Sequence, residues 1–191
     1  MNRKFFLTLL AALCSWWGVS AQQVAVKTNL LYWATTTPNI GVEVALSDHY
    51  TVSVSANYNP WTVNDHAMIQ HWFVQPEIRY WFTGKFTRSF LGAHMIAGQY
   101  KLGGFKLPFN LFSSFRSHHY KGWAVGLGLT YGYQFYISPH WNLEASLGVG
   151  YARTKYDCYD LNGNYTSTRS RNYLGPTHVG LSFIYLFNAK K

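Results

Sequence analysis

The acidic side chains are the scarcest charged groups in this 191-residue chain, with 7 Asp and Glu against 16 Lys and Arg. Three of them, Glu43, Glu77 and Glu144, stand in segments of alternating apolar and small polar residues, and Arg79 and Lys27 share that setting. Such groups could move protons or ions, or could pair with one another, and buried charges are tolerated only when they are paired. We therefore predict an interior charge network of these five residues. A proton or ion path would require a continuous wet channel.

Serine and histidine residues offer raw material for nucleophilic catalysis. His94, His118, His119 and the pair Ser113-Ser114 could join a Ser–His–acid set, but no carboxylate is matched to them in the sequence. The His118-His119 pair also lacks a neighbouring carboxylate or cysteine, which favours solvent exposure over a metal site. We predict no catalytic, cofactor-binding or metal-binding residues.

Basic residues concentrate in or beside two polar stretches, 101–121 and 156–172. A cationic rim there would suit the phosphates of lipopolysaccharide or another anionic partner, while ordinary solvated charges are an equally good interpretation. The candidate contacts with an anionic partner are Arg153, Lys155, Arg169, Arg171, Lys101, Lys106 and Arg116.

These residues are positioned by segments with a period of two. From Trp123 to Phe135 large apolar residues alternate with Gly, Ala, Thr and Gln, and the segment from Trp141 to Tyr151 repeats the pattern. A period of two predicts strands. In one segment the outward set could be either Leu91 with its odd-numbered neighbours or Phe90 with the even-numbered ones. We predict no helix and eight strands, near 25–34, 40–47, 50–58, 74–82, 89–100, 123–135, 141–151 and 173–187.

The connections alternate between short and long. Tight turns are expected at 47–49, 83–87 and 138–140, and the loops at 35–39, 59–68, 101–121 and 156–172 lie on the other side. This asymmetry is typical of outer-membrane barrels. The small polar face could not line the apolar cavity of a soluble lipocalin-like barrel, so it must point inward and the apolar face must meet lipid. The predicted fold class is all-β, an eight-stranded antiparallel up-and-down transmembrane β-barrel.

The first 21 residues have the features of a secretory signal peptide. Arg3 and Lys4 are basic, residues 5–17 are apolar, and small residues precede position 22. We predict a signal peptide at 1–21 and an outer-membrane β-barrel domain at 22–191. The expected location is the outer membrane of a Gram-negative bacterium, with the loops extracellular and the termini periplasmic.

The last predicted strand carries a polar, glycine, hydrophobic, aromatic order at His178, Gly180, Phe183 and Tyr185. This order resembles the terminal-strand signal that outer-membrane barrels present to the barrel insertion machinery. The resemblance implies that machinery as a partner, although the signal here is slightly internal because 188–191 follow it.

Several longer segments extend the resemblance over most of the chain. The chain resembles an uncharacterised family of small outer-membrane β-barrel proteins from Bacteroidetes, a domain of unknown function. The resemblance implies an eight-stranded barrel with no established enzymatic activity, and an occasional association of relatives with fimbrial components. The segments that carry it are 27–32, 37–43, 58–61, 75–81 and 140–146.

Two function classes remain open. The first is a non-enzymatic outer-membrane barrel whose surface loops serve envelope integrity, adhesion or surface-appendage assembly. Its partners would be outer-membrane lipid and lipopolysaccharide, the insertion machinery, and fimbrial or other surface proteins, with no nucleic acid and no cofactor. The alternative is an outer-membrane lipid-modifying enzyme with a Ser/His site at the rim.

Overall fold

The computed structural model describes residues 23–64, 67–103, 119–159 and 165–187. The predicted signal peptide at 1–21 lies outside these residues. No helix within the described ranges is long and apolar enough to cross a membrane.

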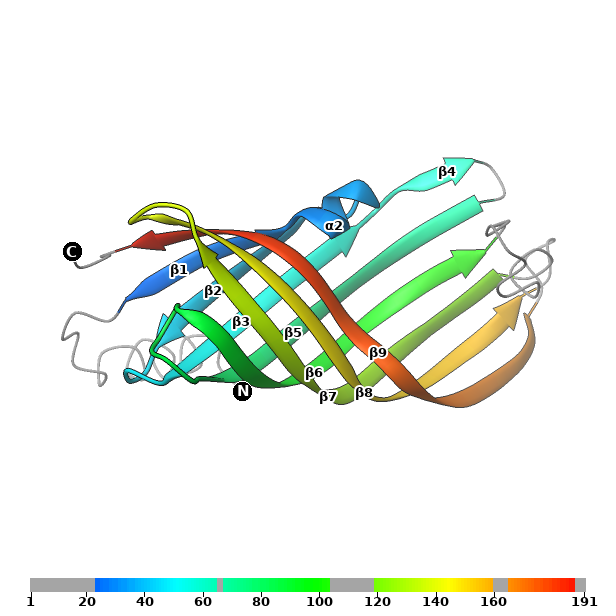
Figure 1. Ribbon diagram of the computed structural model, residues 1–191. Coiled ribbons are helices and arrows are strands. Elements are labelled where there is room, and N and C mark those ends of the chain that lie inside the picture. The colour runs from blue at the N-terminus through cyan, green and yellow to red at the C-terminus, as the bar shows by residue number, and fades with distance from the viewer. Residues whose placement is uncertain (1–22, 65–66, 104–118, 160–164, 188–191) are drawn as a thin grey trace, which may run out of the picture.

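Eight antiparallel strands form a closed ring (Figure 1). Neighbours in the chain pair with each other, and the first strand pairs with the last, with Val24 opposite Phe187. The predicted eight-stranded antiparallel fold is therefore confirmed. A short additional strand, β4 (Thr62–Asn64), pairs with one end of β5. The ring consists of β1 (Val24–Asn29), β2 (Asn39–Ala45), β3 (Tyr50–Asn59), β5 (Ala67–Trp81), β6 (Arg88–Gly103), β7 (His119–Tyr136), β8 (Trp141–Tyr159) and β9 (Tyr165–Phe187).

One helix interrupts the expected pattern. The prediction of a strand over 25–34 and no helix was wrong, because β1 ends at Asn29 and α2 (Leu30–Ala34) follows it. The side chain of Asn29 accepts a hydrogen bond from the Leu31 backbone N–H, which makes it the N-cap. Asparagine is among the preferred N-cap residues because it satisfies a donor that the first helical turn leaves free.

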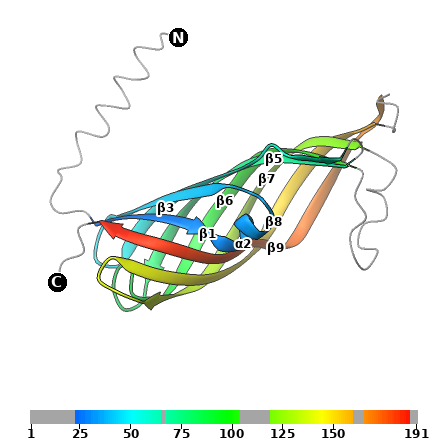
Figure 2. The ribbon, with the colours of Figure 1, turned by 90° about the horizontal axis from the view of Figure 1, so that it is seen from above.

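The strands on one side of the ring are much longer than expected. The prediction of a loop over 156–172 was wrong, because β8 continues to Tyr159 and β9 begins at Tyr165, with Tyr156 opposite Arg169. Cross-strand pairs of aromatic, threonine and long polar side chains stabilise a sheet despite the polar composition. Beyond α2, the ends of β5 to β9 continue together past the short β1 and β2 (Figures 1 and 2). We call this part the projecting sheet, comprising 67–72, 99–103, 119–125, 153–159 and 165–174.

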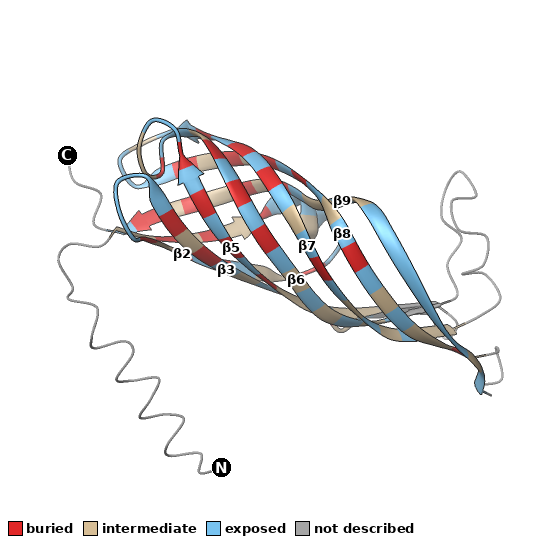
Figure 3. Ribbon diagram, turned by 90° about the horizontal axis from the view of Figure 1, so that it is seen from below, coloured by how far each residue is buried: buried red, intermediate tan, exposed pale blue. Residues whose placement is uncertain are grey.

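The two faces of the wall differ as the alternation predicts. Along β7 and β8 buried and exposed residues alternate (Figure 3), with Leu129 and Leu147 more than half exposed and Thr130 fully buried. In β6 the structure places Leu91 outward and Phe90 inward, which settles the face that the sequence left open.

The turn end of the ring is filled by an apolar cluster. Trp81 is fully buried, with its ring centroid 4.8 Å from Phe90 and 5.9 Å from Phe86. Phe86 belongs to the turn between β5 and β6, which therefore folds back into the interior. The cluster comprises Ala25, Ala45, Trp81, Phe86, Phe90, Ile184 and Leu186.

Candidate functional site

The middle of the interior holds five charged side chains in one network. The Arg79 Nη1 atom lies 2.8 Å from Glu144 Oε2 and 3.0 Å from Glu43 Oε2, and Nη2 lies 2.7 Å from Glu77 Oε2. The Nζ atom of Lys27 lies 3.0 Å from Glu43 Oε2. The structure thus brings together all five residues of the predicted charge network.

The strand order explains how these residues meet. Glu43, Arg79 and Glu144 come from β2, β5 and β8, on different sides of the ring, and each occupies an inward position of its strand. The guanidinium is a planar fork that can serve several carboxylates at once. Its carbon lies 4.2 Å from the centroid of the Phe90 ring, so the charged layer rests directly on the apolar cluster.

Next to the charged layer, two histidines form hydrogen bonds with uncharged side chains. His178 Nε2 lies 2.9 Å from Ser146 Oγ, and its Nδ1 lies 3.1 Å from Gln75 Nε2. His94 lies 2.8 Å from Thr130 Oγ1 and 2.9 Å from Thr177 Oγ1. A register shift next to Gly148 and Val149 makes Thr177 an extra residue of β9, so Thr177 and His178 both reach the interior.

These contacts bear on the alternative of a Ser/His enzyme. The Ser146–His178 pair was not a candidate in the sequence, and it is oriented by an amide rather than by a carboxylate. Ser146 is 8% exposed and faces the interior, where a membrane lipid has no access. The candidate His94 also lies inside. The candidates Ser113, Ser114 and His118 lie outside the described residues.

Little space remains between these layers. The cavity bounded by Lys27, Gln75, Arg79, Glu144 and other interior side chains has a volume of about 30 Å³. Such a volume is enough to hold water. Among the described residues, no group of three His, Cys, Asp or Glu side chains could hold a metal ion.

The residues of the predicted assembly signal all lie on β9, but they serve different faces. His178 and Gly180 point inward, where a Cβ at Gly180 would lie 2.5 Å from Ser146 Oγ. Phe183 and Tyr185 point outward, each with its ring centroid 4.8 Å from that of Trp141. Recognition of these residues by insertion machinery stays a prediction.

The predicted cationic contacts divide between the two faces of the projecting sheet. Lys101, Arg153 and Lys155 are exposed on its outer face, whereas the register places Arg169 and Arg171 on its inner face. Lys106 and Arg116 lie outside the described residues. None of the five described cations forms an ion pair with another described residue, in contrast to those of the interior.

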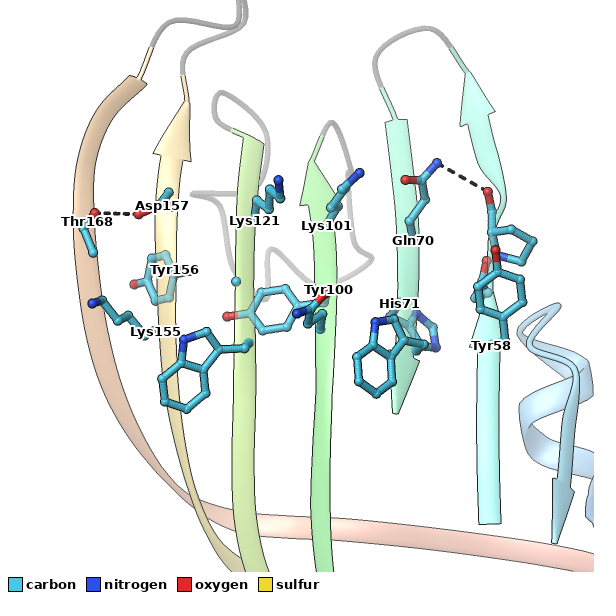
Figure 4. Close-up of a pocket in the computed structure, with 16 residues that line it drawn as sticks. Tyr58, Gln70, His71, Tyr100, Lys101, Lys121, Lys155, Tyr156, Asp157 and Thr168 are labelled. Atoms are coloured by element: carbon cyan, nitrogen blue, oxygen red, sulfur yellow. Dashed lines mark hydrogen bonds between the residues drawn. The ribbon is translucent and has the colours of Figure 1, made fainter. Parts of the chain in front are cut away.

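An open cavity of about 720 Å³ lies against the projecting sheet, and the outward-facing Lys101, Lys121 and Lys155 are among the residues that line it (Figure 4). A single row of paired residues runs across its wall, from Asn59 through His71, Tyr100 and Gly122 to Tyr156. Burial raises the pKa of the Tyr100 hydroxyl, which keeps this group a neutral hydrogen-bond donor. Sequence reasoning missed this cavity because it assigned 59–68, 101–121 and 156–172 to loops, whereas Asn59, Lys101, Lys121 and Tyr156 lie in strands.

The closed ring of antiparallel strands, with a polar interior and an apolar exterior, defines the chain as a β-barrel. The chain belongs to the family described as "Protein of unknown function (DUF3575)", whose model matches residues 5–187. The predicted membership of a domain of unknown function is thereby confirmed, while an origin in Bacteroidetes stays a prediction.

The chain was also compared with solved structures and with curated proteins. The chain is similar to the crystal structure of a major outer membrane protein from Thermus thermophilus, with 11% sequence identity and a TM-score of 0.49. The alignment covers 87% of this chain and 99% of that one. The comparison with curated proteins gives no match.

Proposed function

We propose that the protein is a non-enzymatic outer-membrane barrel that anchors the projecting sheet at the surface of a Gram-negative cell and supports envelope integrity. The observation that carries the proposal is the outer wall, where a continuous set of aliphatic side chains is exposed. Monomeric proteins in water rarely expose apolar patches larger than a few hundred Å². In a bilayer the same wall is satisfied by acyl chains. The exposed aliphatic residues include Ile40, Val42, Val54, Ile78, Leu91, Met95, Val125, Leu127, Leu129, Leu147, Val149 and Val179.

Aromatic residues frame this wall at both ends of the strands, as in barrels that cross a membrane. On β8, Trp141 and Tyr151 are both exposed, and ten residues of a strand tilted by about 40° span roughly 26 Å along the membrane normal. This span matches an apolar band of about 25 Å. The other exposed rings at the two ends are Tyr50 and Tyr58, Trp72 and Tyr80, and Trp123 and Tyr133.

The interior supports an anchoring role over a conducting one. The apolar cluster closes the turn end, and the layer centred on Arg79 lies directly on it. Buried charges that are paired hold their geometry, because exposing or separating them costs several kcal/mol. The apolar cluster and the charged layer therefore both block a path for ions through the barrel interior.

The outward cations of the projecting sheet support a contact with anionic headgroups. Lys101 and Lys121 are directly opposite each other, and Lys155 is opposite Trp123, one of the rings of the aromatic frame. Like charges placed opposite each other destabilise a sheet unless an anion compensates them, and Asp157, opposite Lys121 on its other side, is the only carboxylate of this row among the described residues. Phosphates of outer-membrane lipid or lipopolysaccharide would lie at this height, just beyond the aromatic residues. Adhesion and surface-appendage assembly are finer roles that the projecting sheet would serve.

The location and orientation can be tested by labelling intact cells with a membrane-impermeant maleimide. Ser170→Cys lies in the projecting sheet and Ser47→Cys lies in the turn between β2 and β3, and both serines are exposed. We expect Ser170→Cys to react on intact cells and Ser47→Cys to react only after the outer membrane is opened. The matched control is the wild-type chain, whose Cys158 is buried. Labelling of both variants only after cell lysis would contradict the proposal.

A further inference from the structure

One edge of the projecting sheet has no strand beside it. β9 pairs with β8 along its whole length, but on its other side β1 reaches only as far as Ser182, opposite Asn29. The stretch from Tyr165 to His178 therefore presents its main-chain groups without a neighbouring strand in the described structure, and it forms the outer margin of the sheet in Figure 3. At about 3.4 Å per residue, the exposed part from Tyr165 to Leu174 offers more than 30 Å of edge.

The ladder is ended by a side chain rather than by a loop. The amide of Asn29 donates to the Val179 carbonyl and accepts from the Leu181 N–H, so it takes the place of the next residue of β1. These contacts also show which β9 residues turn their main-chain groups toward the edge. Main-chain groups alternate in direction along an antiparallel strand. Because Thr177 is an extra residue at the register shift, the residues that point toward the edge are odd-numbered after it and even-numbered before it, starting with Pro176. Pro176 has no N–H to leave unpaired. The same alternation turns Thr168, Ser170, Asn172 and Leu174 toward the open edge.

The charge along this edge is mainly positive. Arg169 and Arg171 are exposed on the inner face of β9, and Arg153 and Lys155 are exposed on the outer face of the adjoining β8. The nearby carboxylate of Asp157 already accepts a hydrogen bond from Thr168. A strand added to β9 would therefore meet positive charge on both of its faces.

We propose that the open edge of β9 binds an extended acidic segment of a partner protein by strand addition. Main-chain hydrogen bonds from residues such as Ser170 and Asn172 would supply the affinity, and Arg169 and Arg171 would select carboxylates at alternate positions of the added strand. This inference goes beyond anchoring, and it does not depend on the membrane in which the barrel sits.

A second copy of the chain is a poorer occupant of the same edge. Two β9 strands paired antiparallel about Ser170 would place Arg169 of one copy opposite Arg171 of the other. Like charges directly opposite each other destabilise a sheet. The arginines thus discourage self-pairing, which exposed edges otherwise invite.

The test uses the purified full-length barrel in a neutral detergent and a fluorescent peptide of about twelve residues that alternates valine and glutamate. We expect the glutamate peptide to bind, and a matched valine–lysine peptide to bind at least tenfold more weakly. Ser170→Pro removes an N–H on the open edge and leaves the pairing with β8 intact. This substitution should weaken binding of the glutamate peptide at least tenfold. The same peptide methylated on alternate main-chain nitrogens should also bind the wild-type barrel at least tenfold more weakly.

Further variants test the role of the two arginines. The double variant Arg169→Ser with Arg171→Ser should bind the glutamate peptide at least tenfold more weakly. Lys101→Ser on the outer face should change binding of this peptide less than twofold. Far-ultraviolet circular dichroism and gel mobility of each variant should match those of the wild type. No binding by the folded wild-type barrel, or equal binding of the methylated peptide, would overturn strand addition. Concentration-dependent dimerisation that Ser170→Pro abolishes would assign the edge to a second copy instead.

Discussion

The interior of the barrel and the projecting sheet treat charge in opposite ways. Inside, Arg79 contacts three carboxylates and Lys27 contacts one of them, all within 3.0 Å. On the projecting sheet, no described cation has an ion pair, and β9 also leaves its main-chain edge without a partner. The two regions are built from the same strands, so the difference arises from what surrounds each residue and not from its secondary structure.

The contrast shows where the few acidic residues are used. Burial makes an unpaired charge far more costly than it is in water, so the interior requires carboxylates to match Arg79 and Lys27. The projecting sheet is solvated, and its cations need no internal partner. Charges that the fold does not compensate are the ones available to a ligand, which is why we place the functional surface on the projecting sheet.

The largest expected effect comes from removing the central cation of the interior. Arg79→Met leaves three carboxylates facing one another with only Lys27 nearby, and breaking a buried pair costs about 3–5 kcal/mol. Urea unfolding of the barrel refolded into lipid vesicles, followed by tryptophan fluorescence, measures this loss. Arg171→Met on the projecting sheet is the matched control and should change the free energy of unfolding by less than about 0.5 kcal/mol.

A double variant sharpens the same comparison. Arg79→Met combined with Glu144→Gln removes a cation and an anion together, so we expect it to be less destabilised than Arg79→Met alone. If the double variant is as unstable as the sum of the two single variants, then the layer is held by packing and not by charge compensation.

The next largest effect concerns the outer wall. Leu129 and Leu147 are exposed on β7 and β8, near the middle of the apolar wall. Arginine at either position should cost about 2–4 kcal/mol in lipid, as for a cation at the bilayer midplane. The same unfolding assay measures the cost, with Ser170→Arg on the projecting sheet as the harmless counterpart. Equal stability of Leu129→Arg and Ser170→Arg would rule out a lipid-facing wall.

A smaller effect is expected at the junction of the two regions. Asn29 caps α2 and ends the β1–β9 ladder through two further hydrogen bonds. Asn29→Ala should lower the free energy of unfolding by about 0.5–2 kcal/mol, as the loss of an N-cap does. Faster amide hydrogen exchange should be confined to α2 and to β9 near Leu181. Uniform acceleration across the barrel would show that Asn29 stabilises the ring as a whole.

The smallest effect is expected at the turn end, where Lys85 donates to Asp48 over 3.0 Å. This hydrogen bond lowers the pKa of the Asp48 carboxyl below its usual value of 3.8. The contribution to stability is therefore present above about pH 4 and disappears as the pH falls through the lowered pKa. The stability of Asp48→Asn should approach that of the wild type only in that acidic range. A difference between them that grew as the pH fell would contradict this sign.

The sequence predicted the barrel because a strict period of two leaves few alternatives. Glu43, Glu77, Arg79 and Glu144 could be assigned inward from parity alone, whereas their contact depended on height and tilt, which a linear pattern does not contain. The segments 30–34 and 156–172 were misassigned for different reasons. A cap at Asn29 competes locally with strand extension, and the pairing of residues 156–159 with 165–169 is a contact between strands that composition does not reveal.

The central claim is that paired charges and apolar rings close the barrel, so that it anchors a surface and does not conduct. Ion conductance through a planar lipid bilayer containing the purified full-length protein tests this claim most directly. We predict no conductance steps from the wild-type barrel under a steady applied voltage, with a known porin as the positive control for insertion assays. Reproducible ohmic steps from the wild-type protein would contradict the account and would make the interior a channel.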